Sequence, residues 1–121
     1  MTILSKSRDF TVQELYALTK DPKISKLKEH VGEVLEVTGY VLRDELSADG
    51  KDPVSTLTLE LAEGGAVASN SPTVQRSFQE ILDIYEFTGD KPFPMFLTVF
   101  TDTARKSGRE YINIRLMGDQ H

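Results

Sequence analysis

The clearest pattern of hydrophobic and polar positions lies between residues 71 and 85 and predicts one amphipathic α-helix. Ser71 suits the position before the first turn, because its hydroxyl can accept hydrogen bonds from free backbone N–H groups. Pro72 suits the first helical position, where no N–H is needed. Apolar side chains then recur every three or four residues on one face, at Val74, Phe78, Ile81, Leu82 and Tyr85. We expect this face to pack on a core.

Alternating apolar and polar residues predict five β-strands, three before this helix and two after it. The expected strands are 33–43, 55–61, 66–68, 95–101 and 110–116. Gly39 interrupts the first strand, and a glycine inside a long strand is typical of a bend or bulge. The order βββαββ is that of an OB-fold barrel. We therefore expect a mainly β protein with helices, built on a five-stranded OB-fold barrel.

The first 30 residues are expected to lie outside the five strands. The polar residues at the start read as an N-terminal arm. Thr11 and Glu14 have the spacing of a capping box, which predicts a short helix over 12–18. The chain thus divides into an N-terminal segment, 1–30, that packs on the barrel or on a partner, and an OB-fold domain, 31–121.

The strand at 95–101 is apolar on both faces. Met95, Leu97 and Val99 alternate with Phe96 and Phe100. If the first set faces the core, the two phenylalanines lie at the surface, where an exposed aromatic pair is typical of a contact site. The alternatives are that the phenylalanines form the core face, or that the helix and the N-terminal segment bury both faces.

Aromatic and cationic side chains coincide on the predicted strands and on the turn between the last two. Every base offers a π-face to an aromatic ring, and every phosphate offers a charge to lysine or arginine, so such a surface can hold a single strand. The candidate nucleic-acid-binding residues are Tyr40, Arg43, Phe96, Phe100, Arg105, Lys106, Arg109, Tyr111 and Arg115. The alternative for each is a structural role in covering the barrel, or solvation at a hairpin tip.

Composition excludes much other chemistry. The 121 residues include no cysteine, so disulfides, thiol nucleophiles and cysteine-bound zinc are excluded. His30 and His121 are isolated, and the carboxylates lack a phosphate loop or a catalytic grouping, so we expect no enzyme, metal site or cofactor. The chain has no signal-peptide pattern and no apolar run of about 20 residues, which predicts a cytoplasmic protein without membrane contact. A net charge of −5 requires any nucleic-acid contact to depend on a local basic patch.

Between Val31 and Leu116 the chain resembles the single-stranded-DNA-binding proteins of small tailed phages that replicate by protein priming. The resemblance is carried by Gly32, Val37 and Gly39, by residues 59–71 (LELAEGGAVASNS), by Thr73-Val74 and Ile81-Leu82 in the helix, and by residues 106–112 (KSGREYI). It implies non-specific binding and protection of single strands during phage DNA replication in the host cytoplasm, without catalysis. The implied partners are single-stranded DNA or RNA, further copies of the chain and replication proteins.

A second function class fits the same residues. An adaptor that binds a protein through the same barrel would account for the acidic balance and for the two-faced strand at 95–101. Single-stranded DNA binding is the leading hypothesis, and non-enzymatic protein–protein interaction is the alternative.

Overall fold

The computed structural model describes residues 1–46 and 50–117. Its strands are β1 (Thr2–Lys6), β2 (Ser25–Lys26), β3 (Val34–Leu46), β4 (Pro53–Leu61), β5 (Ala66–Ser69), β6 (Met95–Thr103) and β7 (Glu110–Leu116). Its helices are α1 (Val12–Thr19), the short 3-10 helix η1 (Leu27–His30) and α2 (Pro72–Thr88). The protein is mainly β with helices, as predicted. The described part has seven strands instead of five, because the N-terminal segment contributes β1 and β2.

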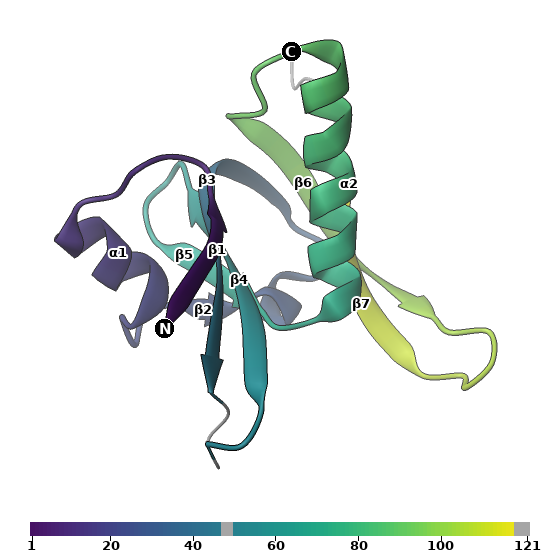
Figure 1. Ribbon diagram of the computed structural model, residues 1–121. Coiled ribbons are helices and arrows are strands. Elements are labelled where there is room, and N and C mark those ends of the chain that lie inside the picture. The colour runs from purple at the N-terminus through teal and green to yellow at the C-terminus, as the bar shows by residue number, and fades with distance from the viewer. Residues whose placement is uncertain (47–49, 118–121) are drawn as a thin grey trace.

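All seven strands belong to one curled sheet, in the order β2-β5-β4-β3-β6-β7, with β1 paired to β3 (Figure 1). The first half of β3 pairs with β6 and its second half with β1, while β4 follows it from Val37 to Leu46. The ladder between β3 and β4 shifts register between Val37 and Gly39, at the predicted bulge. Within the described residues β5 and β7 do not pair, so the curled sheet stays open along a seam between these two strands.

The predicted amphipathic helix is confirmed as α2. The Ser71 hydroxyl accepts a hydrogen bond from the Val74 N–H, and Gly89 caps the end of the helix after Thr88, with a φ of 80° that suits a residue without a side chain. Its buried residues Val74, Phe78 and Ile81 join the main core with side chains from β3 to β7. The apolar face predicted from the sequence is therefore the face that packs on the sheet.

The core face of β6 is now determined. Met95, Leu97 and Val99 are buried in the main core, whereas Phe96 and Phe100 lie half-buried on the other side of the sheet. The first of the alternatives for this strand is the correct one. Two aromatic rings are consequently left for surface contacts.

The start of the chain forms a strand where an arm was predicted. β1 pairs with β3, and Ile3 packs in a second, smaller core around Leu18, Val41 and Ala66. Phe10, Leu15 and Ile24 complete this second core. Side chains along β1 alternate between the two faces of the strand, and this places Ile3 in the second core while its two neighbours stay exposed.

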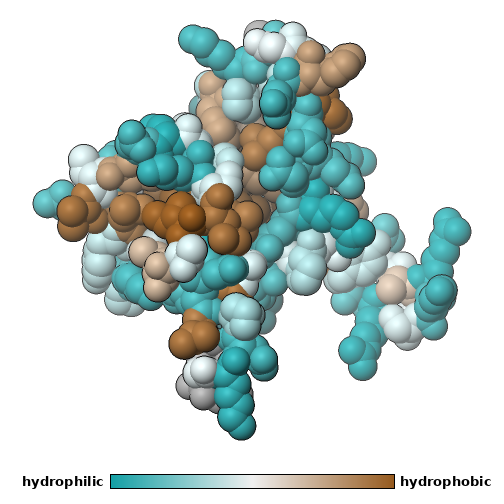
Figure 2. All heavy atoms as spheres, viewed as in Figure 1, coloured by the Kyte–Doolittle hydropathy of each residue, from teal (hydrophilic) through white to brown (hydrophobic). Residues whose placement is uncertain are grey.

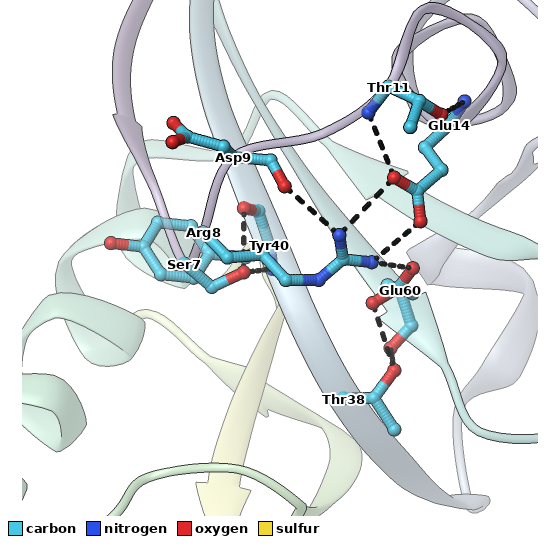
Figure 3. A network of polar contacts seen from close by, with 8 residues as sticks. All are labelled: Ser7, Arg8, Asp9, Thr11, Glu14, Thr38, Tyr40 and Glu60. Atoms are coloured by element: carbon cyan, nitrogen blue, oxygen red, sulfur yellow. Dashed lines mark hydrogen bonds and ion pairs between the residues drawn. The ribbon is translucent and has the colours of Figure 1, made fainter.

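Arg8 connects the N-terminal segment to the sheet (Figure 3). Its guanidinium donates hydrogen bonds to both carboxylate oxygens of Glu14, at 3.3 and 3.1 Å, and to Glu60 Oε2 on β4, at 3.2 Å. Glu14 also accepts a hydrogen bond from the Thr11 N–H, so the predicted capping box is confirmed. The Arg8 guanidinium, followed by the Thr11 N–H, lowers the pKa of Glu14 to about 2.

Gly39 lies at a position without room for a side chain. A Cβ there would lie 2.8 Å from Glu60 Oε1 and 2.8 Å from Ser7 Oγ. Both oxygens are held in place, because Ser7 accepts a hydrogen bond from the Tyr40 N–H and Glu60 accepts one from the Thr38 hydroxyl. Replacing Gly39 by alanine is therefore expected to lower the free energy of unfolding by about 1–2 kcal/mol, measured by urea denaturation.

A double-mutant cycle provides the control for Gly39→Ala. In a Glu60→Ala background the carboxylate no longer needs to move, so the same glycine substitution is expected to cost less. Equal losses in both backgrounds would show that Glu60 is not the obstacle and would leave Ser7 Oγ as the steric cause.

Candidate nucleic-acid interface

Arg43, predicted to bind nucleic acid, is a structural residue. It is 6% exposed, and its guanidinium donates hydrogen bonds to the Thr58 hydroxyl at 2.9 Å and to the carbonyl of Thr19 at 3.1 Å. Further hydrogen bonds run to the carbonyl of Leu18 and to Glu45 Oε1. These groups belong to α1, β3 and β4, so Arg43 holds α1 on the sheet and is removed from the candidate interface.

Tyr40 is also part of the core. It is 8% exposed, and its ring packs edge-on against Phe78, with centroids 5.1 Å apart. Its hydroxyl lies 2.6 Å from Ser5 Oγ on β1. Because the ring is buried and packs against Phe78 and Phe93, almost none of its face is left to stack on a base.

Phe96 is placed in acidic surroundings. It lines a hollow of about 440 Å³ between the start of β3, the end of β4 and the start of β6. The exposed carboxylates of Glu33, Glu36 and Glu63 line the same hollow. Phe96 lies on the same face of β6 as Phe100, but its neighbours in this hollow are carboxylates, and negative side chains repel phosphates.

The remaining six candidates lie together on the hairpin formed by β6 and β7. The strand register pairs Thr98 with Arg115, Phe100 with Asn113 and Asp102 with Tyr111, so these side chains share one face. On this face the Arg115 guanidinium lies over the Phe100 ring, 6.0 Å from its centroid. Phe100 and Tyr111 are half-buried and Arg115 is exposed, which leaves part of each ring accessible to a partner.

Three cations occupy the tip of this hairpin. The turn is closed by hydrogen bonds between Ala104 and Arg109 and between Gly108 and Ala104, and Gly108 has a φ of 70°. Arg105, Lys106 and Arg109 are all exposed there. The hairpin extends away from the rest of the molecule in Figure 1, and Figure 2 shows hydrophilic side chains over its tip.

The tip cations differ from three cations of the N-terminal segment that lie beside carboxylates. In the described part of the chain, ion pairs neutralise Lys6, Arg8 and Lys20, which lie near Asp9, Glu14 and Glu45. Within residues 1–46 and 50–117, none of the three tip cations has an ion-pair partner. Their charge is therefore available to an external anion.

A second cationic feature was missed from the sequence. A hollow of about 490 Å³ lies at the open seam of the sheet, between η1 and β5 on one side and Ile112 of β7 on the other. Lys26 and Lys28, both exposed, line it together with polar groups of Thr56 and Asn70. We name it the seam hollow. The basic character of residues 23–30 was the available sequence signal, but their place beside β5 depends on a two-residue strand.

Other kinds of site receive no support from the described residues. No helix among them is long and apolar enough to cross a bilayer. They contain no group of three or more His, Asp or Glu side chains that could hold a metal ion. His30 lies beside Ser25 and Glu33, and His121 lies outside the described residues. Comparisons with protein-family models, curated proteins and solved structures give no match, so the resemblance to phage proteins stays a prediction.

Proposed function

We propose that the protein binds single-stranded nucleic acid, DNA in the first place, without sequence preference and without catalysis. The observation that carries this proposal is the group of three tip cations, which have no ion-pair partner among the described residues and lie on the same hairpin as the rings of Phe100 and Tyr111. Phosphates pair with the cations, and bases stack on the rings. Arg115 adds a cation to the aromatic face.

The lack of sequence preference follows from the kind of contacts offered. Sequence is read by hydrogen bonds to base edges, whereas cations and aromatic rings contact phosphates and base faces that all nucleotides share. The tip and the hairpin face supply mainly cations and aromatic rings, which contact phosphates and base faces. Protection of displaced strands during phage DNA replication, in the host cytoplasm, is the setting that the sequence resemblance suggests.

The proposal includes an OB-fold interpretation of the curled sheet. β3, β4, β5, α2, β6 and β7 would form its βββαββ order, with β1 and β2 as additions. OB-folds bind oligonucleotides on their second and third strands and on the loop between the last two. In this protein those elements are β4 and β5, which line the seam hollow, and the hairpin tip. On this interpretation a single-stranded nucleic acid runs from the seam hollow to the hairpin tip.

Fluorescence anisotropy of labelled oligo-dT tests the proposed function. We expect saturable binding at low salt that weakens as salt rises, because counterions are released when phosphates are neutralised. A duplex of the same length is the control and should bind more weakly, since its bases are not free to stack. Absence of binding to both DNA and RNA single strands at low salt would refute the proposal.

One observation favours the alternative of a protein-binding adaptor. Apolar side chains are exposed over α1 and β1, where Val12 is 80%, Tyr16 54% and Leu4 51% exposed. Figure 2 shows a hydrophobic band in this region. Exposed apolar surface of this kind is typical of protein contacts. The adaptor function becomes the better explanation if no oligonucleotide binds.

A further inference from the structure

The hollow beside Phe96 has the chemistry of a docking surface for a cationic segment. Its apolar part includes the half-buried Phe96 and Val34, which is 49% exposed. Glu33, Glu36 and Glu63 surround this part, and all three are exposed. We name it the acidic hollow. A partner that fits it must be narrow and must carry several positive charges.

The chain itself carries a segment with these properties. The tip of the β6–β7 hairpin is a tight turn bearing Arg105, Lys106 and Arg109, none of which has an ion-pair partner within the described residues. The tip carries three cations and the acidic hollow three carboxylates, of which Glu33 also lies 3.2 Å from His30 Nδ1. Charge complementarity therefore links the two surfaces.

The two surfaces lie at opposite ends of the same strand. Phe96 is near the start of β6, and the tip follows its end at Thr103. At the usual rise of an extended strand this places them about 25 Å apart. A tip cannot fold back along its own ribbon to reach the acidic hollow of the same molecule. Contact between them requires two copies of the chain.

We propose that the hairpin tip of one copy docks in the acidic hollow of the next, so that the protein associates head to tail. Such a contact uses two different surfaces, and it therefore generates rings or open chains instead of a closed dimer. The charged side chains are exposed, so salt should weaken the association strongly. This inference does not depend on the proposed function. If both hold, nucleic acid and the acidic hollow compete for the same tip.

Charge reversal tests this contact in the absence of nucleic acid. One variant carries Arg105→Glu, Lys106→Glu and Arg109→Glu at the tip, and the other carries Glu33→Lys, Glu36→Lys and Glu63→Lys at the acidic hollow. Sedimentation at low salt should show association of the unmodified protein and a loss of about tenfold or more in association constant for either variant. An equimolar mixture should associate again, because each variant then offers the surface that the other needs.

A matched control and the opposing outcomes complete the test. Reversal of Glu80, Asp83 and Glu86 on the exposed face of α2 changes the charge by the same amount and should leave association intact. A monomeric unmodified protein at low salt would overturn the proposal, and so would a mixture that stays monomeric. If nucleic acid and the acidic hollow bind the same hairpin tip, added oligo-dT should dissociate the oligomer. An oligomer that persists with bound oligo-dT would refute the competition for the tip, but not the head-to-tail contact.

Discussion

Replacing Arg105, Lys106 and Arg109 together by alanine is expected to weaken the binding of oligo-dT by about 100-fold at low salt. Each phosphate contact on a single strand contributes about 0.7 to the slope of log affinity against log salt. Removal of three contacts should therefore lower that slope by about 2. Anisotropy titrations over a salt series measure both quantities on the same protein.

A triple variant with the same change in net charge distinguishes direct contacts at the hairpin tip from the long-range effect of net charge. Lys6, Lys20 and Lys91 are exposed, and the first two already pair with Asp9 and Glu45. Their replacement by alanine should weaken binding by only about threefold or less, since only long-range charge is lost. Equal losses for the two triple variants would show that binding does not depend on the hairpin tip.

Arg43→Ala is expected to lower the free energy of unfolding by about 3 kcal/mol, the largest stability effect proposed for this chain. The substitution leaves the carbonyls of Leu18 and Thr19 and the hydroxyl of Thr58 without their buried donor. It also removes the hydrogen bonds that join the last turn of α1 to β3 and β4. Urea denaturation, followed by circular dichroism, measures the loss.

Arg115→Ala is the matched control, because this arginine is exposed and its guanidinium lies over the Phe100 ring, 6.0 Å from the centroid. Its stability should change by less than about 0.5 kcal/mol. Oligo-dT binding should show the reverse order, with a loss for Arg115→Ala and none for folded Arg43→Ala. Weakened binding by the folded Arg43 variant at unchanged stability would restore Arg43 to the interface.

Local sequence signals predicted the elements well. The Ser71-Pro72 start and the three-and-four spacing of apolar residues located α2, and the capping box at Thr11 located α1. Alternation located the last two strands to within two residues at each end. These features depend on neighbours within a few positions, which is the range over which a pattern carries information.

The bulge at Gly39 explains why Tyr40 lies in the core, and the cover provided by α1 explains why Arg43 is buried. Leu35 and Val37 point into the main core before the bulge, but Tyr40 does so after it, because one extra residue exchanges the two faces. The other face of this half of β3 is covered by α1, which buries Arg43. Simple alternation cannot show either effect.

The surroundings of Phe96 and Lys26 depend on residues that are distant in the sequence. The position of Phe96 on the outer face of β6 follows from alternation, but its acidic neighbours come from β3 and from the turn after β4. Lys26 reaches the seam hollow because β2 pairs in parallel with β5, with Ser25 opposite Val67. A strand of two residues leaves no pattern of its own.

The position of β3 at the centre of the sheet has a consequence for how the chain folds during its synthesis. One half of this strand needs β1, from the beginning of the chain, and the other half needs β6, from near its end. On the ribosome β1, β3, β4 and β5 can assemble early, but the edge of β3 that pairs with β6 stays unprotected until β6 emerges. That interval is when the nascent protein is most exposed to aggregation.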